Sequence, residues 1–170
     1  MAAGDVKLVY GTASDATITL ASLASDTSLL TGRESTALDN TSNLFTDYLI
    51  SGKITAGTSP TASRAIEVWA IGSWDSTNWP DVFDGTDSAE TITSVEIKNA
   101  ICRAVAIIAT TNTSDRTYAF GPVSLAGVFG GVVPPKVVFF VTHSTGVNLN
   151  STGSNQQIRI QPVFQNVAAS

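Results

Sequence analysis

Residues 156–164, Gln-Gln-Ile-Arg-Ile-Gln-Pro-Val-Phe, alternate polar and apolar side chains around Ile158 and Ile160. A period of two places the two isoleucines on one face of a β-strand and the polar residues on the other. Residues 64–71 show the same alternation, because Ile66 and Val68 fall on the face opposite Glu67 and Trp69. Both segments are therefore predicted to be strands with one face in a hydrophobic core.

Five further strands are expected in residues 16–23, 44–55, 100–111, 117–123 and 136–142. Residues 100–111 are apolar on both faces, which predicts a central strand, and Gly52 predicts a bend or bulge. Short helical turns are expected within residues 90–100 and 124–129. Because no long helical pattern separates the strands, the predicted fold is an all-β, antiparallel β-sandwich. A jelly roll is favoured among the Greek-key arrangements, although the pattern does not distinguish them.

A chain of 170 residues is long enough for one domain with its own core. Residues 1–40 are rich in small and hydroxylated side chains and are expected to form an N-terminal arm plus a first strand. Residues 41–170 are expected to form the sandwich, with a long acidic loop at 72–99. The single Cys102 excludes an intrachain disulfide.

The chain carries few charges, with a net charge of −5 and only 14% charged residues. Lysine and arginine are scattered, so nucleic acid is not an expected partner. No apolar run approaches the roughly 20 residues of a membrane helix, and residues 1–10 lack the features of a secretion signal. A surface this poor in charge suits a protein packed against neighbours, because desolvating charges is costly.

Catalytic and cofactor motifs are not evident in the sequence. His143 is the only histidine, and no G-x-S-x-G elbow accompanies it, so a structural role is expected. Cys102 lies in an apolar segment without clustered cations, which predicts a buried, inert thiol. We therefore expect a protein that is not an enzyme and uses no cofactor.

Acidic and aromatic residues gather in and near residues 72–99. The acids recur near a three-residue spacing, but they do not match an EF-hand loop, so a solvated loop is favoured over a calcium site. Trp74 and Trp79, with Trp69 and Tyr48, are compatible with a sugar-binding platform. Anchoring of the loop or a subunit contact is the favoured interpretation of Trp74 and Trp79.

The N-terminal residues Val6, Leu8 and Tyr10 alternate as in a β-strand. A stretch this short has few apolar contacts to offset the entropy cost of ordering it. One hypothesis is therefore an arm that orders only against a neighbouring subunit, by adding a strand to an exposed sheet edge. The alternative is a polar edge strand with a frayed terminus.

Three stretches resemble small structural proteins of tailed bacteriophages. They are residues 32–54, which begin with GREST and end with LISGKI, residues 79–87 (WPDVFDGTD) and residues 141–147 (VTHSTGV). The similarity covers most of residues 30–165. It implies a virion component, most naturally a capsid cement or decoration protein that binds the major capsid protein.

Proteins of that kind are often β-rich and trimeric, so a homotrimer on the capsid surface, made in the host cytoplasm, is expected. The resemblance carries no functional residue with it. A tail or head-fibre subunit and a carbohydrate-binding β-sandwich module remain as alternatives.

Overall fold

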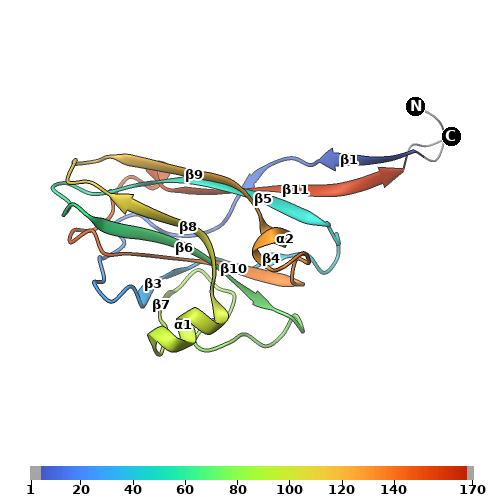
Figure 1. Ribbon diagram of the computed structural model, residues 1–170, viewed down its shortest axis with the longest axis horizontal. Coiled ribbons are helices and arrows are strands. Elements are labelled where there is room, and N and C mark those ends of the chain that lie inside the picture. Colours follow the sequence, from blue (N-terminus) through green and yellow to red (C-terminus); the bar gives the residue numbers. More distant parts are fainter. Residues whose placement is uncertain (1–4, 168–170) are drawn as a thin grey trace.

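The strands form two antiparallel sheets that lie face to face (Figure 1). The computed structural model describes residues 5–167. The five-stranded sheet has the order β1-β11-β5-β9, with β2 also paired to β11, and the six-stranded sheet has the order β7-β3-β10-β6-β8, with β4 paired to β10. The predicted all-β, antiparallel sandwich is confirmed.

The elements are short and follow the turn-rich sequence closely. The five-stranded sheet contains β1 (Val6–Tyr10), β2 (Ser14–Asp15), β5 (Asp47–Thr55), β9 (Thr117–Ser124) and β11 (Gln157–Val167). The six-stranded sheet contains β3 (Thr31–Glu34), β4 (Leu38–Asp39), β6 (Arg64–Ser73), β7 (Ala89–Thr91), β8 (Arg103–Thr110) and β10 (Lys136–His143). The helical turns are α1 (Val95–Ile101), α2 (Leu125–Val128) and η1 (Gly153–Asn155). Within residues 5–167, none of these helices has the length and apolar character needed to cross a membrane.

The main hydrophobic core lies between the two sheets. It is built from alternate residues of the facing strands, including Ile50 and Ile54 of β5, Ile66 and Val68 of β6, Phe139 of β10, and Ile158 and Ile160 of β11. The alternation predicted for residues 64–71 and 156–164 is thus confirmed. Each large side chain buried in this way contributes roughly 1.5–3 kcal/mol relative to exposure.

A second hydrophobic cluster covers the opposite face of the six-stranded sheet. Its buried members are Ile71, Phe83, Ile92, Cys102, Val138 and Phe140. α1 packs against this cluster through Ile97 and Ile101 and lies on this side of the sheet (Figure 1). β10 is therefore covered on both faces, which explains why its sequence is apolar at every position from 137 to 141.

The prediction of a central strand at residues 100–111 is wrong. The strand in this region, β8, lies at the edge of the six-stranded sheet, and Ile107 on it is exposed. The N-terminal part of the apolar run belongs instead to α1 and its C-terminal cap at Cys102. An apolar run shared between a helix and an edge strand has the same composition as a single central strand, so periodicity did not separate them.

Residues 16–23 do not form the predicted strand. They leave the five-stranded sheet, where the Ala16 amide donates to the Ile158 carbonyl at 2.8 Å, and reach the other sheet, where Thr17 accepts a bond from the Thr36 amide. Leu20 enters the main core on the way. The first forty residues thus supply β1 to β4 to both sheets.

Gly52 marks a β-bulge, as predicted. The pairing of β5 with β9 shifts register between Ile50 and Gly52. A side chain at position 52 would meet the Gln157 carbonyl oxygen and the Phe120 ring. Glycine is therefore required by the close approach of the neighbouring strands.

Candidate functional site

A two-stranded ribbon, made of β1 and the C-terminal half of β11, projects beyond the sandwich (Figure 1). Its register pairs Val6 with Val167, Leu8 with Gln165 and Tyr10 with Val163. Directly opposite residues of an antiparallel pair share a face, so the exposed apolar members of these pairs form one stripe, whereas Val163 is buried. We call Val6, Leu8, Tyr10 and Val167 the ribbon stripe.

The ribbon stripe is highly exposed for apolar side chains. The exposed fractions are 62% for Val6, 58% for Leu8, 58% for Tyr10 and 60% for Val167. A contiguous apolar surface contributed by neighbouring strands is typical of an interaction site, whereas single exposed apolar residues are ordinary.

The outer edge of β1 also presents backbone hydrogen-bonding groups. The Gly11 amide donates to the Pro162 carbonyl at 2.8 Å, which sets the hydrogen-bonding phase of the ladder. In an antiparallel pair every second residue bonds to the partner strand. The amides and carbonyls of Val6, Leu8 and Tyr10 therefore point away from β11. An edge of this kind is a template for an added strand.

The sequence hypothesis placed Val6, Leu8 and Tyr10 on an arm that becomes ordered only on a neighbour. The structure instead pairs them with the same chain's β11. The reason is the length of β11, whose 11 residues run past the sandwich and offer β1 a partner. The pairing leaves the predicted alternation and its exposed face intact.

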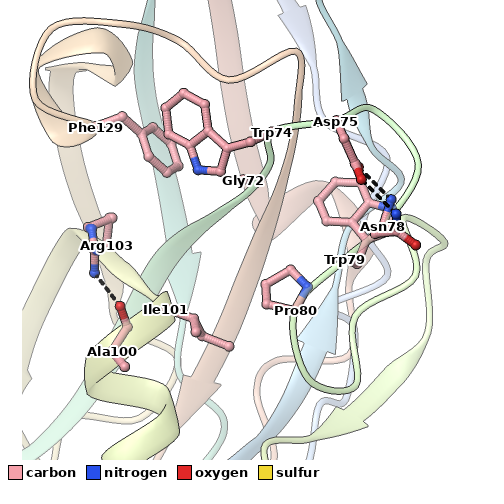
Figure 2. A pocket seen from close by; sticks show the side chains of 10 residues that line it. All are labelled: Gly72, Trp74, Asp75, Asn78, Trp79, Pro80, Ala100, Ile101, Arg103 and Phe129. Atoms are coloured by element: carbon pink, nitrogen blue, oxygen red, sulfur yellow. Dashed lines mark hydrogen bonds between the residues drawn. The ribbon is translucent and has the colours of Figure 1, made fainter.

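Trp74 and Trp79 line one pocket of about 650 Å³. The pocket lies between the segment after β6 and the junction of α1 with β8, with Phe129 at one side (Figure 2). Trp74 is 60% exposed and meets the Phe129 ring edge to face at 6.1 Å. Trp79 packs against the second hydrophobic cluster. The two tryptophans thus combine anchoring with a shared open pocket.

The other two aromatic residues lie elsewhere, so the four do not form one platform. Tyr48 is buried in the main core, and its hydroxyl donates to Asn40 at 2.8 Å. Trp69 is half-buried on the face of the six-stranded sheet that points away from the main core. Its indole N–H donates to Glu67 at 2.9 Å. The sequence did not indicate that these aromatic residues lie apart, because their positions depend on which face of its strand each side chain occupies.

The acidic residues of the 72–99 segment stabilise turns and contacts with distant parts of the chain. Asp75 accepts hydrogen bonds from the Asn78 side chain and from the backbone amides of Asn78 and Thr77. Together these bonds hold the Asp75 pKa below its usual range. Asp87 accepts from Arg33 Nε at 2.5 Å. Among the residues that the structure describes, no three metal-binding side chains gather at one point.

His143 and Cys102 are both buried. His143 ends β10, where Nδ1 lies 3.0 Å from Thr145 Oγ1 and Nε2 lies 3.0 Å from the Leu23 carbonyl oxygen. Burial lowers the His143 pKa and raises the pKa of the Cys102 thiol to about 12. The histidine thus ties β10 to the 16–23 segment, and the thiol is protonated at neutral pH.

The buried polar contacts of Lys98 and Glu34 were not anticipated from the sequence. Lys98 on α1 donates to Glu67 on β6 at 2.5 Å and to the Leu29 carbonyl at 2.6 Å, which fixes α1 against the six-stranded sheet. Glu34 accepts from the Gly85 amide at 2.7 Å, and burial raises its pKa to about 7. The sequence signal that could have indicated the Glu67 contact is a single acidic residue within an otherwise apolar strand.

Comparison of the chain with protein-family models, with curated proteins and with solved structures found no significant match to any of them.

Proposed function

We propose that this chain is a structural protein of a tailed-bacteriophage virion, a cement or decoration protein that binds the major capsid protein on the outer face of the head. The observation that carries the proposal is the projecting ribbon, with its apolar stripe and open strand edge. A protein whose role is to hold neighbours together needs such a contact outside its own core. The resemblance of the sequence to phage structural proteins supplies the biological setting.

The rest of the molecule is consistent with a scaffold for that contact. The central strand β10 of the six-stranded sheet is covered on both faces, and the two sheets share one core. With 14% charged residues, few ionic groups must be desolvated when the surface is covered. A trimer would present three ribbons at once and gain avidity without further contacts in each subunit.

The decisive experiment is binding to purified heads that lack the protein, from the phage whose genome encodes it. The full chain should bind in saturable numbers set by the lattice. The variant Val6→Thr/Leu8→Thr/Tyr10→Thr introduces threonine, which favours strands, so β1 should still form. Because the variant removes most of the ribbon stripe, it should bind clearly more weakly. Ile107→Thr, an equally exposed apolar residue on β8, is the matched control and should bind normally. Absence of the protein from particles, with no binding to heads, would refute the proposal.

A tail or head-fibre subunit is the alternative within the virion, since a ribbon that joins neighbours serves a fibre equally well. The location of the protein in electron density of the particle separates the two. Density over the capsid lattice would support a cement protein. Density confined to the tail or to fibres would support a tail or head-fibre subunit instead.

A further inference from the structure

The pocket that contains Trp74 and Trp79 lies away from the ribbon and combines features that a structural contact does not require. Its volume of about 650 Å³ lies within the usual range of small-molecule sites. It is lined by side chains of two kinds, aromatic or aliphatic walls and a few polar groups, as ligand sites generally are. Figure 2 shows these side chains arranged around the open space.

The exposed Trp74 side chain of the aromatic wall is positioned by a ring contact. Trp74 stands edge to face against Phe129 at an interplanar angle of 89°. The adjoining turn is held by Asp75, which binds Ser73 before it and Asn78 after it. An exposed indole that is held in place presents an electron-rich face, which favours the partly positive C–H groups on one side of a sugar ring.

The polar groups lie at opposite sides of the pocket (Figure 2). On one side lie Asp75 and Asn78, which bond to each other. Asp75 Oδ1 accepts from Ser73, Thr77 and Asn78, whereas Oδ2 accepts from the Asn78 side chain alone and keeps a lone pair for a ligand. On the other, Arg103 directs one terminal nitrogen to the Ala100 carbonyl at 2.9 Å, which fixes its guanidinium and leaves further N–H donors for a ligand. Hydroxyl groups both donate and accept, so a polyol is matched to such a mixed lining.

Charge selects among polar ligands. Arg103 and Asp75 contribute opposite charges to the lining, so the pocket has no net preference for an anion or a cation. A phosphate or an acidic sugar would meet one cation and one carboxylate. The hydroxyls of a neutral saccharide suit both groups, because a hydroxyl donates to a carboxylate and accepts from a guanidinium.

We propose that this pocket binds a neutral saccharide, with Trp74 as the stacking residue and Asp75, Asn78 and Arg103 as hydrogen-bonding residues. This binding site is independent of the ribbon. On a virion protein it would add recognition of a glycan surface to attachment to the head.

The test is binding of the full-length protein to a glycan array, followed by calorimetry with linear hexasaccharides of glucose, mannose, galactose and N-acetylglucosamine. At least one neutral probe is expected to bind. Trp74→Ala should weaken that binding about tenfold or more, equivalent to about 1.4 kcal/mol, while the melting temperature stays unchanged. Arg103→Gln should weaken it by a smaller factor, because it keeps N–H donors but loses the charge.

Leu44→Ala, an exposed apolar change outside the pocket, and the ribbon variant Val6→Thr/Leu8→Thr/Tyr10→Thr should bind the same saccharide normally. No binding of any neutral probe up to about 10 mM overturns the proposal. Binding of sialylated or uronic-acid probes alone overturns the neutral class, and binding that survives Trp74→Ala overturns the site.

Discussion

β10 and β1 are both apolar strands, yet their surroundings are opposite. In β10, Val137 to Val141 are fully buried, since the main core covers one face and the second cluster the other. In β1, Val6, Leu8 and Tyr10 remain more than half exposed in a ribbon beyond the sandwich. The same kind of side chain therefore stabilises the fold in one strand and is available to a partner in the other.

The comparison has a measurable consequence. Removing apolar atoms from β10 should reduce the free energy of unfolding and leave any partner contact unaffected until the fold is lost. Removing them from β1 should reduce association and leave the free energy of unfolding nearly unchanged.

Phe139→Ala should destabilise the protein most. Phe139 is completely buried between the sheets, and truncation leaves a cavity that costs about 3–5 kcal/mol. Chemical denaturation monitored by circular dichroism measures this change, with Phe139→Leu as a milder variant if the alanine protein does not fold. Leu8→Ala, the counterpart in the ribbon, should stay within about 0.5 kcal/mol of the wild type. Equal losses in both strands would contradict the comparison.

Glu34 should make stability depend on pH. Its pKa in the folded protein is raised to about 7 from 4.5, so the folded state binds the proton more tightly than the unfolded state. The contribution of Glu34 is greatest below pH 4.5 and is lost as the pH rises through 7, by up to about 3 kcal/mol. The difference in unfolding free energy between wild type and Glu34→Gln should follow this course. A difference that is constant with pH would show that Glu34 titrates normally.

His143→Gln should lower the free energy of unfolding by about 1–3 kcal/mol, because it disturbs the buried contacts with Thr145 and Leu23. The lowered pKa of His143 means that its contribution is present above pH 6.5 and lost as the pH falls below that value, opposite in sign to Glu34. Binding to heads should not change once the variant is folded. Loss of a hydrolytic activity in a folded variant would show that the protein is an enzyme.

Deletion of residues 1–10 should have the smallest effect on stability and a large effect on association. The deletion keeps Gly11 and its bond to Pro162 but removes β1 and most of the ribbon stripe. The melting temperature of the isolated chain should stay nearly unchanged, whereas trimer formation, followed by light scattering, and binding to heads should weaken. A large drop in melting temperature for a monomer would show that β1 belongs to the stability of the sandwich. A wild-type chain that is monomeric both in solution and on the particle would refute the trimer.

The candidate contact residues were accessible from the sequence only in part. Alternation identified Val6, Leu8 and Tyr10 as one face of a strand, but Val167, the fourth member of the stripe, lies at the other end of the chain. Trp74 and Trp79 were noticed for their residue type. Arg103 was not, because it follows α1 and reaches the pocket only through the packing of that helix on the sheet.

What the sequence determined by itself is the local pattern: a period of two in β6 and β11, the bulge at Gly52, and an all-β fold without long helices. These follow from the chemistry of neighbouring residues, which needs no knowledge of distant partners. Tertiary structure alone decided that β10 is central and β8 is at an edge, that residues 16–23 cross between sheets, and that β1 pairs with β11. Each of these depends on contacts between residues far apart in the chain, and a strand's own residues do not record which strand lies beside it.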